Sequence, residues 1–260
     1  KDGCNRHVLI DECRELFGEI YEQIPELPFC NIWTAMQLSS RLPKGALFHM
    51  GVSNTRRCWN MFQLPESVES ACNVGCCGID GCVSTLVGAS LVNPDRLCYV
   101  VVGDLTFFYD LNSLGNHHIG TNLRVMLVNN GRGTEFRLGI HHCNVFGDDA
   151  DKYMAAAGHF GNKSPLLVKH YAEDLGFHYL SATTKEEFMT ALSNFTNPQL
   201  SDHSMILEVF TDSKDESEAL YLMSHIQSDA KGMVRSKLKD AVRNVAGEKG
   251  INAIKKILKK

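Results

Sequence analysis

The sequence has no long hydrophobic run, and none of its apolar stretches approaches the roughly 18 residues that a membrane-spanning helix needs. It also has no low-complexity tract and only 7 prolines in 260 residues, which excludes the disordered and collagen-like classes. With 44% hydrophobic and 22% charged residues, the chain contains enough apolar side chains to bury a core. We therefore expect a soluble globular protein with one large or two small domains.

The ten cysteines include no Cys-x-x-Cys pair, although a cluster is formed by Cys72, Cys76, Cys77 and Cys82. The spacing of this cluster fits neither a zinc ribbon nor a redox dithiol. No apolar secretory segment stands at the start of the sequence, so reduced thiols are expected. The sequence favours a cytoplasmic protein whose cysteines act mainly as small buried hydrophobic residues.

Charge is distributed unevenly along the chain. Residues 229–260 contain ten Lys and Arg against three Asp and Glu, a net charge of +7, whereas residues 1–228 carry −11. Because phosphate backbones bind basic surfaces, the acidic body argues against nucleic acid as the main partner. Apolar residues recur at helical spacing in the basic tail: Val234, Leu238, Ala241, Val242 and Val245. We predict amphipathic helices there that contact the acidic body, an acidic partner or a membrane of anionic lipid.

Short apolar runs rich in β-branched or aromatic residues alternate with helical patterns. The runs are 46–50, 97–102, 123–128, 177–180 and 205–210, and the intervening or following helices are 82–91, 107–117, 165–175, 185–195 and 216–226. This alternation is typical of βαβ units and predicts an α/β fold, a doubly wound, mostly parallel sheet with helices on both faces. Three regions are expected: a helical lead-in (1–45, with helices near 8–23 and 32–42), the α/β domain (46–228) and the basic helical tail (229–260).

Two of the predicted strands end in polar, loop-forming residues: Gly103-Asp104 after the first, and Asn130-Gly131 after the second. In a parallel sheet both ends lie at the carboxyl edge, where open α/β sheets bind ligands. The Asp104 carboxylate, the Asn130 amide oxygen and a carbonyl of the glycine-rich turn are ligands suited to Mg²⁺ bound to a diphosphate. The backbone amides that open the helix at Asp104 are expected to face the same diphosphate.

At these residues the sequence resembles the thiamine diphosphate enzymes, whose metal motif is Gly-Asp followed later by Asn-Asn. More narrowly, it is similar to the SEPHCHC synthase family of the menaquinone pathway, which decarboxylates 2-oxoglutarate and joins the product to isochorismate. The matching segments are Leu47 to Ser53, Asn73 to Thr85, Gly103 to Thr106, and Asp110 to Asn112. The similarity covers about residues 32–222 and corresponds to the C-terminal, diphosphate-binding (PP) third of such enzymes.

The resemblance implies a set of cofactor contacts. Mg²⁺ would be bound by Asp104, the Asn130 side chain and the backbone carbonyl of Arg132. The diphosphate of thiamine diphosphate would contact Gly103, Leu105 and Thr106. The remaining cofactor contacts would come from Ser53, Gly78, Ile79 and Phe136, with Ile79 as the apolar wedge that bends the cofactor.

Arg57 and Asn73 are the residues that the resemblance places at the substrate. One position departs from the family, where an arginine that grips a substrate carboxylate follows the Asn of Asn-Arg-Gly; here it is Val74. Losing a planar, bidentate cation removes much of the carboxylate recognition, so the isochorismate reaction does not follow from the resemblance. His141 and His142 are candidates for the mouth of the site, although a loop His pair is more often solvated.

The family also uses a glutamate to generate the reactive carbanion, and this residue lies on a pyrimidine-binding domain, normally of the partner subunit. No residue of this chain matches it, so no catalytic residue is assigned. The stretch before Ile32 is too short for such a domain, and the start at Lys1 indicates a processed or cut chain. The resemblance therefore implies half of a 2-oxo acid decarboxylase or carboligase, in a homo- or hetero-oligomer with the missing domain.

Two other interpretations stay open. A catalytically inactive domain of the same fold would serve as a regulatory or scaffold subunit; Asp104 and Asn130 count against it and Val74 counts for it. The second interpretation is a generic nucleotide-binding α/β domain. The absence of a Gly-x-Gly-x-x-Gly turn after the first strand argues against this interpretation.

Overall fold

The computed structural model describes residues 4–139, 141–162 and 164–226. The described residues divide into two compact units: residues 29–217 form one, and the described parts of the two ends, before residue 29 and after residue 217, form the other. Helix α1 (Cys4–Glu22) belongs to the unit of the two ends, and the sheet lies in the larger unit. The basic tail predicted at 229–260 lies outside the described residues.

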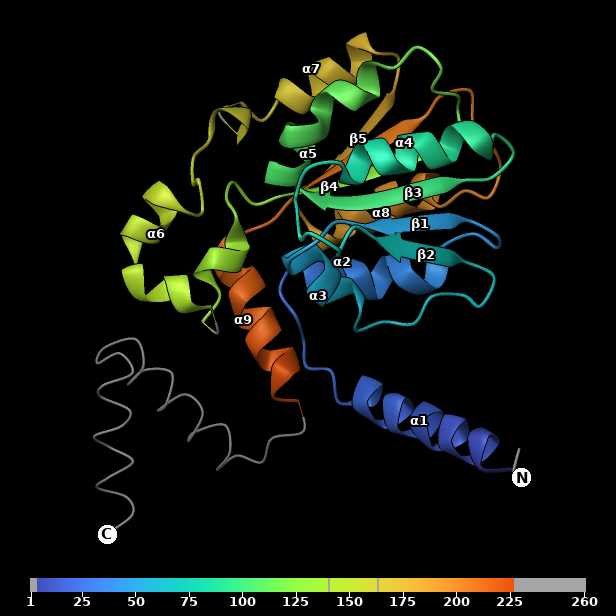
Figure 1. Ribbon diagram of the computed structural model, residues 1–260, viewed down its shortest axis with the longest axis vertical. Coiled ribbons are helices and arrows are strands. Elements are labelled where there is room, and N and C mark those ends of the chain that lie inside the picture. Colours follow the sequence, from blue (N-terminus) through green and yellow to red (C-terminus); the bar gives the residue numbers. More distant parts are fainter. Residues whose placement is uncertain (1–3, 140, 163, 227–260) are drawn as a thin grey trace. The chain divides into compact units, whose positions relative to one another are not determined.

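Within the described residues, six parallel strands form one sheet with the order β2-β1-β3-β4-β6-β5 (Figure 1). The strands are β1 (Leu47–Met50), β2 (Glu69–Cys72), β3 (Cys98–Gly103), β4 (Leu123–Asn129), β5 (His178–Ala182) and β6 (Met205–Phe210). The predicted α/β fold with a parallel sheet is confirmed, and all five predicted strands are present with ends shifted by two residues at most.

Helices cover both faces of this sheet (Figure 1). One face packs against α4 (Cys82–Val92), α5 (Asp104–Asp110) and α7 (Leu167–Asp174), and its core includes Val100, Val102, Val125 and Leu127. On the other face, α3 (Asn54–Trp59) and α8 (Lys185–Phe195) contact the strands, and α2 (Asn31–Leu38) packs against α3. There the Phe48 and Trp59 ring centroids are 5.1 Å apart, and those of Tyr99 and Phe195 are 5.5 Å apart. Successive strand residues point to opposite faces, so β3 supplies both cores.

Strand β2 and helix α3 were not predicted from the sequence. Glu69–Cys72 forms the edge strand, pairs only with β1 among the described strands, and is mostly exposed. An exposed edge strand needs no apolar run, so it carries none of the pattern that identified the others. Helix α3 has six residues, most of them polar, and is too short to show a helical period.

The helix boundaries follow local capping. Helix α5 begins at Asp104, three residues before the predicted start, and continues as the short helix η2 (Leu111–Gly115). Helix α7 begins two residues after the predicted start, because Ser164 first forms a turn in which its carbonyl accepts from the Leu167 N–H. Helix α9 (Ser213–Ser224) begins earlier than predicted, because the Asp212 side chain accepts from the Lys214 N–H.

The remaining short elements are η1 (Ser39–Arg41), η3 (Thr134–Arg137), η4 (His142–Phe146), α6 (Asp148–Tyr153) and η5 (Phe160–Asn162). No helix in the described part of the chain has both the length and the apolar character of a membrane span. The nine cysteines from Cys13 to Cys143 are free thiols. Four of them are buried, Cys30, Cys58, Cys82 and Cys98, so the prediction that the cysteines are mainly buried is wrong for the other five, which lie in exposed or partly exposed segments.

A buried carboxylate joins the first half of α9 to the start of α2. Glu216 is 1% exposed, and its Oε1 accepts from the Asn31 N–H (3.0 Å) and the Thr211 hydroxyl (2.7 Å). The Asn31 side-chain oxygen in turn accepts from Trp59 Nε1 (2.9 Å). Burial deprives the carboxylate of hydration and raises the pKa of Glu216 to about 7, although both hydrogen bonds oppose the rise.

This burial predicts how stability depends on pH. Because the folded protein holds a proton on Glu216 up to about pH 7 and the unfolded chain only to about pH 4.5, the free energy of unfolding falls as pH rises through this window. Gln keeps the shape and the acceptor but cannot ionise. We expect the effect of Glu216→Gln on the free energy of unfolding to be more stabilising at pH 8 than at about pH 5, by about 1–3 kcal/mol.

Urea denaturation at the two pH values measures this difference. Glu218→Gln, an exposed glutamate of the same helix, is the matched control and should show little pH dependence. Equal pH profiles for both variants would show that Glu216 does not titrate in this window.

Candidate active site

A cavity of about 280 Å³ opens where the carboxyl ends of β3 and β4 meet the loop after β1. Nine of the twelve residues predicted for the site line it: Ser53, Ile79, Gly103, Asp104, Leu105, Thr106, Asn130, Arg132 and Phe136. The other three, Arg57, Asn73 and Gly78, do not. The strand register explains why these residues lie together: Gly103 pairs with Val128, so β3 and β4 end at the same edge of the sheet.

The oxygen donors of the predicted metal site border this cavity. Asp104 is 2% exposed, and its Oδ1 accepts from the Leu105 N–H at 2.9 Å. Gly131, with φ of 79°, allows the tight turn after Asn130, and the Asn130 Oδ1 lies 3.4 Å from the Arg132 nitrogen that donates to it. One carboxylate, one amide oxygen and one backbone carbonyl thus come from two short segments.

A histidine contacts the same carboxylate from far along the chain. His159 Nε2 lies 3.0 Å from Asp104 Oδ2. Its segment is fastened to the Asn130 loop by two backbone hydrogen bonds, from Gly133 N–H to Ala155 O (2.6 Å) and from Gly158 N–H to Gly131 O (3.1 Å). No sequence signal indicated this contact, because 55 positions separate the two side chains.

Ion pairs and a buried network hold the Asn130 loop in place. Arg132 Nη1 donates to both oxygens of Asp151 in α6 at 2.8 Å, and Arg137 Nε lies 3.2 Å from the same carboxylate. Behind the loop, Asn129 donates to Glu208 Oε1 at 2.8 Å. Burial raises the pKa of Glu208, although its hydrogen bonds oppose the rise. The position of Asn130 is therefore fixed from both sides.

The segment from Asn73 to Gly81 forms another wall. Asn73 Nδ2 donates to Gly81 O (3.2 Å) and Thr85 Oγ1 (3.0 Å), which ties the segment to the start of α4. Ile79 reaches the cavity, and a Cβ at Gly78 would lie 2.5 Å from Asp80 Oδ1, so a larger residue there would require the Asp80 side chain to move. Asn73 thus positions this wall and does not line the cavity.

Two residues that line the cavity have unusual backbone conformations. Ser53 has φ of 62° and Cys77 has φ of 53°, in the region that favours glycine. Such conformations cost free energy and persist where the surrounding structure fixes them, which happens often at binding sites. The backbone around the cavity is therefore held in place at some cost in stability.

Arg57, predicted to contact the substrate, is already paired. Its Nη2 lies 2.7 Å from Glu135 Oε1 and its Nε lies 3.2 Å from Oε2, so the guanidinium and carboxylate share two hydrogen bonds. These bonds raise the pKa of Arg57. Glu135 lines the cavity, and its contact with Arg57 was not predicted although Glu135 lies directly before Phe136. The positive charge of Arg57 is therefore neutralised by Glu135.

Other lining residues were also missed, among them Asn31, Cys77 and Thr134. Thr134 is 4% exposed, and its hydroxyl makes no hydrogen bond to any other described residue. A buried hydroxyl without a partner costs about 1–3 kcal/mol, which marks Thr134 as a candidate contact for a bound group. His141 packs its ring edge-on to Phe136 with centroids 5.3 Å apart, and neither it nor His142 lines the cavity.

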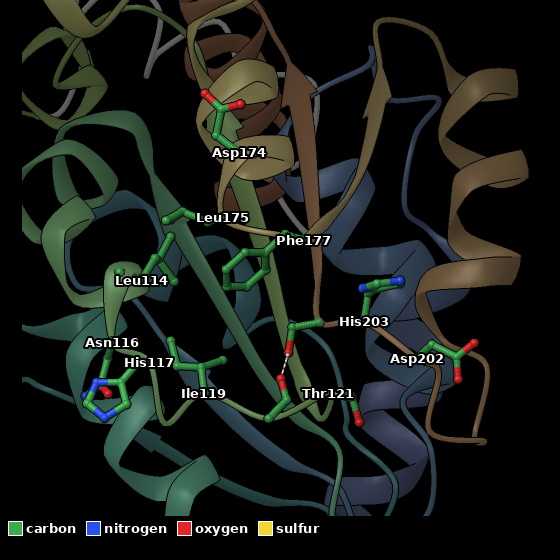
Figure 2. Close-up of a pocket in the computed structure, with 14 residues that line it drawn as sticks. Leu114, Asn116, His117, Ile119, Thr121, Asp174, Leu175, Phe177, Asp202 and His203 are labelled. Atoms are coloured by element: carbon green, nitrogen blue, oxygen red, sulfur yellow. Dashed lines mark hydrogen bonds between the residues drawn. The ribbon is translucent and has the colours of Figure 1, made fainter.

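A second cavity of about 450 Å³ lies at the opposite edge of the sheet (Figure 2). The loops that precede β4, β5 and β6 form it, with Leu114, Ile119 and Phe177 among the lining residues. The Ser204 hydroxyl donates to Gly120 O at 2.9 Å and accepts from the Leu123 N–H, so its bonding capacity is used. None of the described lining residues has a buried polar atom without a partner, and we assign no ligand here.

No family model matches this sequence, but curated relatives are similar to it over about three quarters of its length. The 2-succinyl-5-enolpyruvyl-6-hydroxy-3-cyclohexene-1-carboxylate (SEPHCHC) synthase of Bacteroides fragilis is 34% identical over 196 residues, 75% of this chain and 34% of that protein. The enzyme of that name from Phocaeicola vulgatus is 34% identical over 200 residues, 76% of the chain and 34% of the relative. The enzyme of that name from Christiangramia forsetii is 33% identical over 199 residues, which are 76% of this chain and 33% of the relative.

This chain spans about one third of the length of the curated relatives that it matches. The resemblance indicated by the motifs around Asp104 and Asn130 is confirmed. Three quarters of this chain is similar in sequence to a segment that makes up about one third of the length of each SEPHCHC synthase.

Proposed function

We propose that this chain binds thiamine diphosphate through Mg²⁺ and forms one half of the active site of a 2-oxo acid decarboxylase or carboligase. A pyrimidine-binding domain, from another chain or another part of a longer one, supplies the other half. The observation that carries the proposal is the meeting of Asp104, Asn130 and Arg132 at one cavity. The similarity to SEPHCHC synthases supports the cofactor class.

The residues that line the cavity fit Mg²⁺ and thiamine diphosphate. Mg²⁺ prefers oxygen ligands, and the Asp104 carboxylate, the Asn130 amide oxygen and the Arg132 carbonyl would hold it. Gly133 is closely packed in this loop, because a Cβ there would lie 3.1 Å from Leu105 Cδ1 and 3.2 Å from the Phe136 ring, and these side chains would have to shift. The buried Thr134 hydroxyl offers a hydrogen bond that no other described residue accepts or donates.

When bound, thiamine diphosphate would supply the electron sink that decarboxylation of a 2-oxo acid requires. The chain's own contribution is binding, orientation and exclusion of water. Ile79, Leu105 and Phe136 form apolar parts of the wall, and Thr106 lines the cavity beside Asp104. A largely apolar site with a few fixed polar groups is typical of cofactor pockets.

Proton transfer has no evident carrier in this half. Of the described residues that line the cavity, Asp104 and Glu135 carry carboxylates. Asp104 contacts His159 and the Leu105 N–H, and both oxygens of Glu135 are bonded to Arg57. A general acid or base has to reach the reacting atom and exchange a proton freely. We therefore propose that this group comes from the missing domain.

The segment after the Asn130 loop provides a surface for that domain. Helix α6 and its neighbours lie beyond the carboxyl ends of the strands (Figure 1). Large apolar side chains are exposed along this segment: Val145 (57%), Phe146 (54%), Tyr153 (71%) and Phe160 (85%). Exposed groups of this kind often mark protein interfaces.

A second candidate function is that of an inactive regulatory or scaffold subunit with the same fold. Two observations favour it: Val74 replaces the family's arginine, and Glu135 occupies the guanidinium of Arg57. The experiments below distinguish it from an active half-site.

The first experiment tests the metal site. Asp104→Asn keeps the size of the side chain but removes its charge, and Asn130→Ala removes an oxygen ligand. We expect each variant to lose Mg²⁺-dependent affinity for thiamine diphosphate by at least about tenfold, since each removes one of few protein ligands. Calorimetric titration with and without Mg²⁺ measures this, and Asp174→Asn, exposed at the opposite edge, is the control. Unchanged affinity in both site variants would refute the assigned metal site.

The second experiment tests the half-site. We expect the chain to bind cofactor but to release no CO₂ from 2-oxoglutarate or pyruvate, because a missing general acid–base typically costs ~10²–10⁴-fold in rate. Adding a candidate pyrimidine-binding protein should restore turnover. Rapid turnover by the chain alone would overturn the half-site proposal, and cofactor binding without turnover in any mixture would favour the inactive subunit.

The third experiment tests the Arg57–Glu135 pair in the completed enzyme. Glu135→Gln would remove the charge that neutralises Arg57, so that the guanidinium could bind the second carboxylate of a dicarboxylic 2-oxo acid. A charged hydrogen bond of this kind should lower the KM for the dicarboxylic acid about tenfold, relative to any change in the KM for pyruvate. Glu69→Gln is the matched control, because Glu69 pairs with Arg96 at 3.0 Å beside a different cavity. Equal changes in KM for both substrates would show that Arg57 does not recognise the second carboxylate.

A further inference from the structure

Helix α1 has one apolar side that is exposed in the structure. Leu9 (61%), Ile10 (40%), Leu16 (49%) and Phe17 (54%) are all solvent-accessible. At 100° per residue, they fall in one arc with Cys13 and Ile20. A helix with an uncovered apolar arc is poorly stabilised in water, because packing of that arc supplies most helical stability.

The opposite side of α1 is acidic: Asp11, Glu12, Glu15, Glu19 and Glu22. Arg14 is the one basic residue between positions 8 and 22, and it pairs with Asp11 at 3.6 Å. The net charge of residues 8–22 is therefore −4. This charge disfavours an anionic lipid surface as the occupant of the apolar arc and favours a basic one.

The tail of the same chain has the complementary pattern. The apolar residues Val234, Leu238, Ala241, Val242 and Val245 fall in one arc when placed at 100° per residue. Residues 229–246 contain five Lys and Arg against two Asp, a net charge of +3. The apolar stretch 234–245 and the α1 stretch 9–20 have equal lengths, each about 18 Å as a helix.

We propose that residues 234–245 form a helix that docks along the apolar arc of α1 in the same chain. Docking covers two apolar arcs that are each unfavourable in water and places Lys and Arg near Glu12 and Glu19 at the border of the α1 arc. Because the tail is tethered, its effective concentration near α1 is high, which favours this contact over one between separate molecules. The inference does not depend on the cofactor proposal.

Cys13 provides a probe for the contact, because it lies in the apolar arc of α1 and its thiol is exposed in the structure. The rate of its alkylation by N-ethylmaleimide in the full chain is followed by mass spectrometry of peptides. The exposed thiols of Cys76 and Cys77, in the larger unit, serve as the internal reference. The docked tail should cover Cys13 and slow its reaction.

Leu238→Asp/Val242→Asp disrupts the apolar arc of the tail and should raise the rate at Cys13 at least about tenfold, because the tail no longer protects it. Ser236→Asp/Asn244→Asp adds the same charge outside that arc and should leave the rate close to that of the unmodified chain. Equal rates at Cys13 in all three proteins would overturn the proposal. Protection that increases with protein concentration, or that requires phosphatidylserine vesicles, would also overturn it, in favour of a second copy or a membrane.

Discussion

Parallel strands that are hydrogen-bonded along their length end at the same edge of a sheet, and β3 and β4 do so with Gly103 opposite Val128. This pairing places Asp104 beside the Asn130 loop, and the rest of the cavity is assembled around these two strand ends. A slip of one residue would turn every side chain of the slipping strand to the opposite face, so the packing of the two cores fixes the register. The geometry of the polar site is thus set largely by apolar side chains of the two cores.

The sequence predicts this part of the molecule well because the relevant signals are local. The apolar runs of β3 and β4 identify buried strands, and Asp104 and Asn130 follow them directly. The edge strand β2 has no such run, since its side chains are mostly exposed. His159 and Asn31 reach the site from positions far along the chain, and Glu135 lines the cavity and pairs with Arg57, which lies 78 positions away. Such contacts depend on the tertiary fold and leave no pattern in the neighbouring sequence.

The charges around the cavity are largely neutralised in pairs. Glu135 neutralises Arg57, and Asp151 neutralises Arg132 and approaches Arg137. These pairs hold the Asn130 loop and the Arg57 side chain in defined positions, and they also neutralise cationic groups that would otherwise attract anions. A diphosphate therefore has to be attracted mainly by a metal ion and by backbone amides, which explains why the Asp104 and Asn130 side chains are central to the proposed function.

The order of strands in the sheet also affects how the protein is made. Strand β6 is the last strand in the described part of the chain, yet it lies between β4 and β5 and is the strand with which β5 pairs. During synthesis β5 emerges before its neighbour exists, and β4, whose residues are buried throughout, keeps one edge open until then. A nascent or shortened chain that ends before Met205 therefore exposes an apolar strand edge, which makes it prone to aggregation and dependent on chaperones.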